Sequence, residues 1–77
     1  MDLNKLLSMI TGQLDSETLS WDELPKLCNL IVTLNSGKEW ETIKWRTESD
    51  LLFIESRFGV SRAIRLDQIA SVAVLPL

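Results

Sequence analysis

The chain has 77 residues, a net charge of −3 at neutral pH, one cysteine and no histidine. This length makes one small domain with a thin margin of stability. The composition excludes an internal disulfide and removes the commonest metal ligand and the usual near-neutral acid–base group. We therefore expect no metal and no other cofactor, and we expect a partner subunit to supply additional stability.

The charge is concentrated in the first third of the chain. Residues 1–27 carry two basic and five acidic side chains, whereas residues 28–77 carry six of each sign. A single unpaired cysteine is typical of a reducing compartment. The sequence has no recognisable signal peptide, and its apolar runs are much shorter than the roughly 20 residues that span a bilayer. We therefore expect a cytoplasmic protein that does not enter a membrane.

Residues 1–28 are predicted to form a helical arm. Asp2 is suited to cap a helix in which leucine and isoleucine recur at helical spacing from Leu3 to Leu14. Residues 15–20 read as a linker. A shorter helix is expected over residues 21–27, with Ser20 and Glu23 as a capping box and Pro25 ending the helix soon after it starts. The first helix is expected to cover one end of the core, and the alternative is that it docks a partner.

Beyond residue 28 the hydrophobic period changes to two, and β-branched residues dominate, as in strands. Five strands are predicted, at residues 30–34, 38–46, 51–57, 61–66 and 70–75. The second strand alternates imperfectly, so we expect a bend near residues 41–42 that places Trp40, Ile43 and Trp45 on one side. The predicted fold is mainly β: an N-terminal α-helix followed by a bent five-stranded antiparallel SH3-like barrel. The whole chain, 1–77, is one domain, with the barrel at residues 29–76.

The last predicted strand, residues 70–75, is apolar on both faces and carries no charge. An edge strand that no lysine, internal proline or bulge protects tends to pair with another strand. We expect it to pair with the fourth strand of an identical subunit, in a head-to-tail contact that can close into a ring. The alternative is that the N-terminal segment covers this edge within the same chain. The residues assigned to the interface are Ser61, Ala63, Arg65, Ser71, Ala73 and Leu75.

An N-terminal helix precedes three spaced hydrophobic patterns. These patterns are Val32-x-Leu34-x-x-Gly37, Leu52-x-Ile54 and Ile64-x-Leu66-x-x-Ile69-x-x-Val72. Over residues 29–75 the chain resembles the Sm-like (LSm, Hfq-type) family. The resemblance implies a helix that caps a bent five-stranded barrel. It also implies homo-oligomeric rings of five to eight subunits, joined through the fourth and fifth strands, that bind uridine- or adenine-rich single-stranded RNA around a pore.

The resemblance also implies where RNA binds. In the family, an acidic residue and an asparagine lie between strands two and three, where this chain has Glu48 and Asp50, with Leu51 in place of the asparagine. An Arg-Gly pair or a Tyr-Lys-His run follows strand four, and residues 65–68 keep only its arginine, Arg65. The resemblance therefore assigns Glu48, Asp50 and Arg65 to the pore side.

Aromatic and basic residues alternate in the middle of the chain. They are Trp40, Trp45, Phe53 and Phe58 beside Lys44, Arg46, Arg57 and Arg62. Aromatic rings stack nucleobases and neighbouring cations hold phosphates, so Lys44 and Arg46 are predicted phosphate contacts. The alternative is that the tryptophans fill the barrel and the charges are only solvated.

Catalysis has little support in the sequence. Cys28 has no candidate base nearby in sequence, and there is no glycine-rich phosphate loop. We therefore expect no enzyme. The leading hypothesis is a ring-forming Sm-like protein that binds single-stranded RNA or scaffolds a ribonucleoprotein. The alternative is an SH3-like homo-oligomeric protein-interaction module without nucleic-acid binding, whose acidic arm meets a protein partner.

Overall fold

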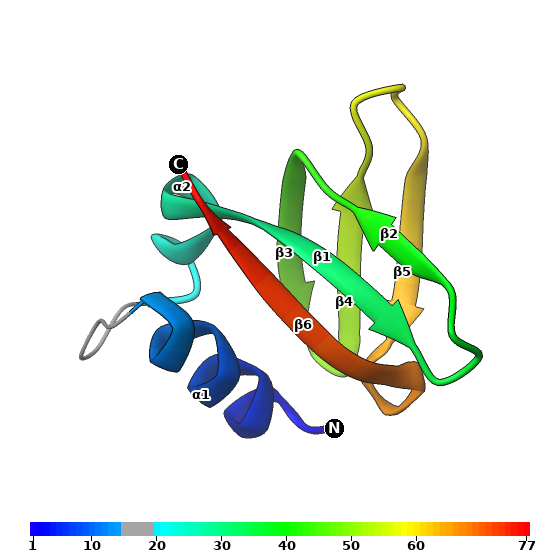
Figure 1. The fold of residues 1–77 in the computed structure, drawn as a ribbon. Helices are drawn as coiled ribbons and strands as arrows, with labels where there is room; N and C mark the ends of the chain where they lie inside the picture. Colours follow the sequence, from blue (N-terminus) through cyan, green and yellow to red (C-terminus); the bar gives the residue numbers. More distant parts are fainter. Residues whose placement is uncertain (15–19) are drawn as a thin grey trace.

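The computed structural model describes residues 1–14 and 20–77, and it is mainly β with an N-terminal helix (Figure 1). Helices α1 (Leu3–Leu14) and α2 (Leu24–Leu27) precede the strands, and a short 3₁₀ helix, η1 (Leu66–Gln68), precedes the last strand. The strands are β1 (Cys28–Leu34), β2 (Glu39–Glu41), β3 (Lys44–Glu48), β4 (Leu51–Glu55), β5 (Ser61–Arg65) and β6 (Ile69–Pro76). Residues 15–19 of the linker expected at 15–20 lie outside the described residues.

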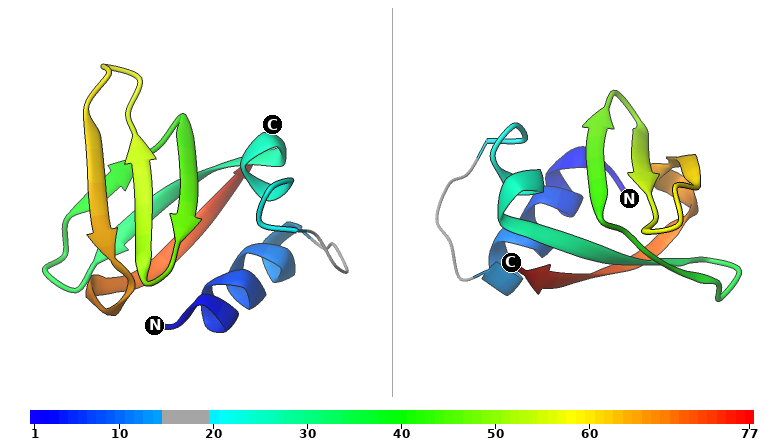
Figure 2. Two further views of the ribbon diagram at one scale, coloured as in Figure 1. Left: turned by 180° about the vertical axis from the view of Figure 1, so that it is seen from behind. Right: turned by 90° about the horizontal axis from the view of Figure 1, so that it is seen from above.

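The strands form two three-stranded antiparallel sheets, with the orders β2-β1-β6 and β3-β4-β5. Figure 2 shows that the two sheets lie face to face, with their strands crossing. The mainly β fold with a leading helix is confirmed. The expected bent five-stranded barrel is not confirmed: the described strands make two separate sheets, because the second predicted strand is divided into β2 and β3.

The division between β2 and β3 is made by a hydrogen-bonded threonine. Thr42 is 1% exposed, and its backbone N–H donates to the carbonyl of Leu30 at 2.9 Å. In return the Leu30 N–H donates to the Thr42 hydroxyl, at 3.0 Å, and not to a backbone carbonyl. Because a side-chain oxygen satisfies β1 at this point, the chain can leave β1 and pair with β4 in the second sheet. The bend expected near residues 41–42 is therefore found.

The side chains at this bend differ from the expectation in one position. Trp45 is 4% exposed and Trp40 is half-buried, as a core-facing side predicts. The prediction that Ile43 joins them was wrong, since Ile43 is 45% exposed. The inward position at the bend belongs to Thr42, whose hydroxyl is needed there to bond Leu30.

The core lies between the sheets and is closed at one side by the helices. Alternate residues of β1 and β4 point into it, as the period of two predicts. The buried hydrophobic side chains are Leu6, Ile10, Leu24, Cys28, Leu30, Val32, Trp45, Leu52, Ile54, Ile64, Leu66, Ile69 and Val72. The Trp45 indole N–H donates to the Cys28 carbonyl at 2.9 Å, and the Trp21 ring meets the Trp45 ring edge-on at 6.3 Å. Trp45 thereby ties β3 to the start of β1.

Helix α1 begins as the sequence predicts. The Asp2 carboxylate accepts a hydrogen bond from the Lys5 backbone N–H at 2.7 Å, which is the expected cap. Leu6 and Ile10 are fully buried, so the helix packs on the core and is not left free.

Helix α2 is shorter than predicted. It begins at Leu24, its cap residue Glu23 makes no side-chain hydrogen bond, and residues 21–23 form a turn instead. The prediction that Pro25 ends the helix was wrong, because Pro25 lies in the first turn, where its missing N–H has no intrahelical partner to lose.

Replacing Thr42 with valine is expected to destabilise the domain by about 1–3 kcal/mol, because the buried Leu30 N–H loses its acceptor while the side-chain volume is kept. Urea unfolding followed by tryptophan fluorescence measures the change. The matched control is Thr47→Val in β3, where the side chain is half-buried. Equal stability of the two variants would show that the Thr42 hydroxyl does not hold the bend.

Candidate functional site

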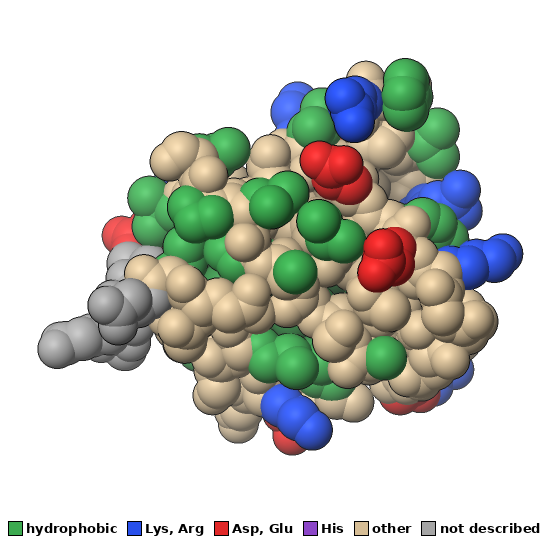
Figure 3. Space-filling model, in the orientation of Figure 1, with side chains coloured by type: hydrophobic (Ala, Val, Ile, Leu, Met, Phe, Trp, Pro, Cys, Tyr) green, Lys and Arg blue, Asp and Glu red, His purple; other side chains and the backbone are tan. Residues whose placement is uncertain are grey.

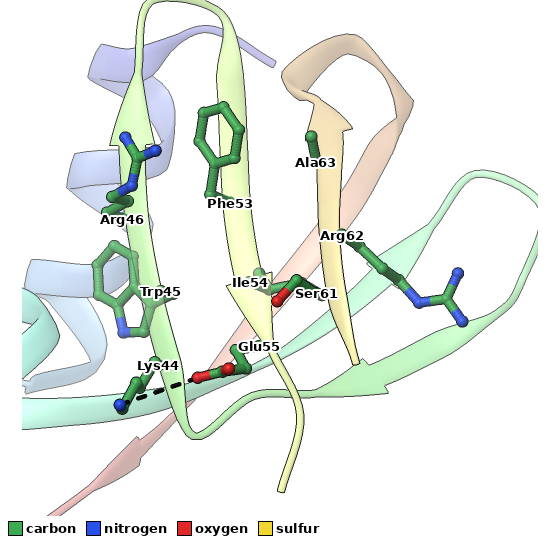
Figure 4. A pocket seen from close by; sticks show the side chains of 9 residues that line it. All are labelled: Lys44, Trp45, Arg46, Phe53, Ile54, Glu55, Ser61, Arg62 and Ala63. Carbon is green, nitrogen blue, oxygen red and sulfur yellow. Dashed lines mark ion pairs between the residues drawn. The ribbon is translucent and has the colours of Figure 1, made fainter. Parts of the chain in front are cut away.

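Most of the residues predicted to contact RNA lie on the outer face of the sheet β3-β4-β5. The strand register aligns three rows across this face: Lys44–Glu55–Ser61, Arg46–Phe53–Ala63 and Glu48–Leu51–Arg65. The alternating residues of β4, Leu52 and Ile54, are buried on the opposite face. Figure 4 shows the middle of the outer face, an open depression of about 530 Å³ where Arg46 and Phe53 project outward beside Ala63.

The structure brings the residues assigned to the pore side close together. Glu48 and Arg65 share one row of the sheet, separated by Leu51. Asp50 lies in the turn between β3 and β4, where Ser49 has a φ of 55°, and its carbonyl accepts the Leu66 N–H at 2.8 Å. The β3–β4 turn and η1 therefore lie side by side, although they are distant in sequence. Lys44 and Arg46 lie on the same face, further from this turn.

Each predicted cation on this face has a carboxylate partner. The pairs are Lys44 with Glu55 at 3.9 Å, Arg46 with Glu48 at 2.8 Å and Arg65 with Asp67 at 2.9 Å. These side chains are solvent-accessible, so each pair contributes about 0–1 kcal/mol to stability. The pairs nevertheless balance the charge of the face. Figure 3, which views the molecule from the side of β1 and β6, shows Lys and Arg around the rim and no single basic patch on that side.

The aromatic residues that were predicted to stack nucleobases have different surroundings. Trp45 is buried in the core, which is the alternative that the sequence left open for it. The others lie beside arginine guanidinium groups, with carbon-to-ring-centre distances of 4.2 Å for Arg46 and Phe53, 4.2 Å for Arg62 and Trp40, and 5.7 Å for Arg57 and Phe58. Phe53 on the outer sheet face thus remains a stacking surface, with a guanidinium already placed over it.

Strand β5 exposes the backbone of three predicted interface residues. In the described structure β5 pairs with β4 alone. Hydrogen bonds from the Ser56 N–H to the Val60 carbonyl and from the Leu66 N–H to the Asp50 carbonyl set the alternation along this pair. Even-numbered residues of β5 therefore bond to β4. The backbone groups of Ser61, Ala63 and Arg65 point to the free edge, and so they are available to another strand.

Strand β6 has the opposite arrangement. It pairs with β1 on one side, and on the other side the Val72 carbonyl and the Val74 N–H bond to the Gln13 side chain at 2.7 and 2.8 Å. The free edge of β6 is thus formed by even-numbered residues. The other three predicted interface residues, Ser71, Ala73 and Leu75, direct their backbone groups to β1. At Val72 and Val74 the N-terminal arm covers the free edge of β6, which is the alternative that the sequence left open.

Gln13 was missed by sequence reasoning, although a signal was present. Leu6 and Ile10 define the buried stripe of α1, and Gln13 follows Ile10 at the helical spacing that continues this stripe. A polar residue on an apolar helical stripe indicates that its side chain has a specific polar partner.

The cysteine, a candidate nucleophile, lies in the core of the described structure. Cys28 is buried, its thiol donates weakly to the Leu24 carbonyl at 3.5 Å, and burial raises the pKa of the thiol. Within residues 1–14 and 20–77 no group of three or more His, Cys, Asp or Glu side chains is placed to hold a metal ion. No helix in the described part of the chain has the length and apolar character needed to cross a membrane.

Cys28 should react with a thiol reagent at pH 8 on the order of 100-fold more slowly in the folded protein than in guanidinium chloride, because burial both blocks access and disfavours the thiolate. Absorbance after addition of a disulfide reagent measures the rate. A control with Ser36→Cys in a Cys28→Ala background places the thiol in an exposed turn and should react rapidly in both conditions. Rapid labelling of folded Cys28 would contradict its assignment to the core.

Comparisons of the chain with models of protein families, with curated proteins and with solved structures found no significant match.

Proposed function

We propose that this chain is a non-catalytic scaffold, a subunit of a homo-oligomeric Sm-like ring of five to eight copies that join head to tail through β5 and β6. The observation that carries this proposal is that β5 and β6, two of the four edge strands of the described sheets, differ in charge. Residues 57–65, which lead into and form β5, carry three arginines and no acid, whereas β6 carries no charge at all.

A difference in charge supports a contact between different edges of two copies. The segment that leads into and forms β5 carries three arginines, whereas β6 is uncharged, and helix α1, which packs against β6, carries Lys5 as its single charge. Two β5 edges brought together would oppose like charges, whereas a β5 edge meets no charge on β6. The contact is therefore head-to-tail, the type that closes into a ring when the rotation permits.

Exposed hydrophobic residues support the same pair of surfaces. Ile43, Phe58 and Val60 are 45%, 84% and 47% exposed, and all three line one pocket near the β4–β5 turn, beside the start of β5. Leu27 and Leu77 are 44% and 77% exposed, and their backbones are hydrogen-bonded at the end of β6. Large apolar side chains that are exposed to water near the free edges of β5 and β6 favour burial against another subunit.

Single-stranded RNA is the second candidate, as a ligand of the assembled scaffold. The observation that favours it is the outer face of β3-β4-β5, where the Arg46 guanidinium lies 4.2 Å from the Phe53 ring beside Lys44. A guanidinium plane and an aromatic ring both stack unpaired bases. The carboxylates on this face lower its attraction for phosphate, so RNA stands second to assembly.

Replacing Ala63 with proline should dissolve the assembly and leave the monomer folded. The Ala63 N–H points to the free edge of β5, so its loss removes an intermolecular bond and no bond to β4. Light scattering coupled to size-exclusion chromatography should show a multiple of 8.8 kDa for the wild type and 8.8 kDa for the variant.

The control for this experiment is Ala63→Ser, which keeps the N–H at an exposed position and should assemble like the wild type. Circular dichroism verifies that both variants are folded. A wild-type chain that remains at 8.8 kDa at high concentration would contradict the proposal.

Opposite changes at the Arg46–Glu48 pair test the RNA candidate. Arg46→Gln should weaken binding of short uridine- or adenine-rich RNA, because it removes a phosphate and stacking contact. Glu48→Gln should strengthen binding, since it frees Arg46 from its carboxylate at 2.8 Å. Fluorescence anisotropy over a salt series measures both, with each lost phosphate contact reducing the salt slope by about 0.7 for a single strand.

Lys38→Gln, in the β1–β2 turn, is the control for a general loss of positive charge. If the wild type does not bind RNA at low salt, RNA is rejected as a ligand and the proposal is reduced to a scaffold for proteins.

A further inference from the structure

The free edge of β6 is occupied in part by a side chain of the same subunit. The Gln13 Nε2 donates to the Val72 carbonyl at 2.7 Å, and the Val74 N–H donates to the Gln13 Oε1 at 2.8 Å. Figure 1 and the left view of Figure 2 both show α1 beside β6, on the side away from β1. One amide thus satisfies a donor and an acceptor that β1 does not reach.

This pair of hydrogen bonds imitates a neighbouring strand. A strand presents N–H and carbonyl groups to an edge, and the Gln13 amide presents one of each. Edge strands are usually protected by charged residues, by an internal proline or by a bulge at the exposed side. Strand β6 has no charged residue, its proline, Pro76, stands at its last position, and its register shift against β1 lies at its other end, between Ile69 and Ser71. Gln13 supplies protection in the middle of β6, where none of these devices lies.

The turn of α1 that holds Gln13 is less deeply buried than the earlier turns, since Leu14 in it is only partly buried. Leu6 and Ile10 are fully buried and fix the earlier turns of the helix in the core. Gln13 lies in the last turn, next to Gly12, and an added Cβ at Gly12 would meet nothing within 4 Å. Glycine is the least favourable helix residue apart from proline, and helix ends fray. The last turn can therefore release β6 while the rest of the helix stays in place.

We propose that Gln13 guards the assembly surface of this protein: the β5 edge of a second copy pairs with β6 by displacing the Gln13 amide from Val72 and Val74. This inference rests on the proposed assembly and adds its regulation. Because the incoming strand replaces hydrogen bonds already made within the subunit, the favourable free energy of association is smaller. Assembly then sets in at a higher protein concentration than an uncovered edge would allow.

Two substitutions in the last turn of α1 should shift assembly in opposite directions. Gln13→Ala removes the guard and should lower the concentration at which half of the chains are assembled by about tenfold, the effect of two modest hydrogen bonds. Gly12→Ala stiffens the same turn and should raise that concentration severalfold. Sedimentation velocity over a concentration series measures both. Ser8→Ala, exposed in the middle of α1, is the matched control and should change nothing.

A second measurement tests the guard without assembly. In the Ala63→Pro background, which is expected to be monomeric, Gln13→Ala should speed hydrogen exchange of the Val74 amide at least tenfold. The Ala73 amide, which faces β1, should be unaffected. Unchanged protection of Val74 would overturn the inference, and the Ala73 amide verifies that the sheet is intact.

The outcomes separate this inference from the proposed function. In one outcome the wild type assembles, Ala63→Pro prevents assembly, and Gln13→Ala leaves the midpoint concentration unchanged. That outcome would overturn the proposed role of Gln13 and support the proposed scaffold. If Gln13→Ala weakens assembly, Gln13 supports the interface and the inference is overturned. If neither the wild type nor Gln13→Ala associates at any concentration, both proposals fail.

Discussion

The fold depends on one exchange of hydrogen bonds, between Leu30 in β1 and Thr42 at the bend. A chain this short must cover both faces of its core with few strands, and one stretch, residues 39–48, supplies β2 to the first sheet and β3 to the second. A continuous ladder beside β1 would keep that whole stretch in one sheet. The Thr42 hydroxyl ends the ladder without leaving the Leu30 N–H unsatisfied, which a buried site would penalise. The following residues are then free to begin β3 in the second sheet.

At the opposite edge of the first sheet, a side chain likewise makes hydrogen bonds that a neighbouring strand would otherwise make. At β6 the Gln13 amide bonds two backbone groups that β1 leaves unpaired. The two sites differ in their surroundings. Thr42 is buried in the core, so its bond with Leu30 does not compete with water. Gln13 is exposed at a helix end beside Gly12, and its bonds compete with water and with other strands. One polar contact therefore fixes the architecture, and the other leaves a part of it open to exchange.

Local sequence pattern was sufficient to locate most helices and strands, but it was insufficient to predict how the strands are arranged in sheets. The period of two located β1, β4 and β5 and the shared face of Leu52 and Ile54, because alternation follows directly from strand geometry. The capping of α1 by Asp2 was equally local. The exposure of Ile43 and the late start of α2 were not predictable, since they depend on which backbone groups find partners in distant segments. The arrangement of two sheets, with β1 between β2 and β6, has the same origin.

For the candidate site, the sequence grouped Lys44 and Arg46 as phosphate contacts and placed Glu48 in the following loop, whereas the structure places all three in β3. The sequence did not reveal that Lys44 meets Glu55, because that contact requires the register of β3 on β4. The direction in which β6 offers its backbone was hidden for a similar reason. A shift of one residue reverses which N–H groups face outward, and only the pairing with β1 fixes it.

The pairing of β1 with β6 has a consequence for the order in which the chain folds. Strands β3, β4 and β5 are joined by short turns, so their sheet consists of contacts that are local in sequence and quick to close. Strand β1 must wait for residues 69–76, which a ribosome makes last among the strands. During synthesis the nascent protein therefore carries one finished sheet and an unfinished one, in which the backbone edge of β1 that faces β6 stays unpaired until the final described strand arrives.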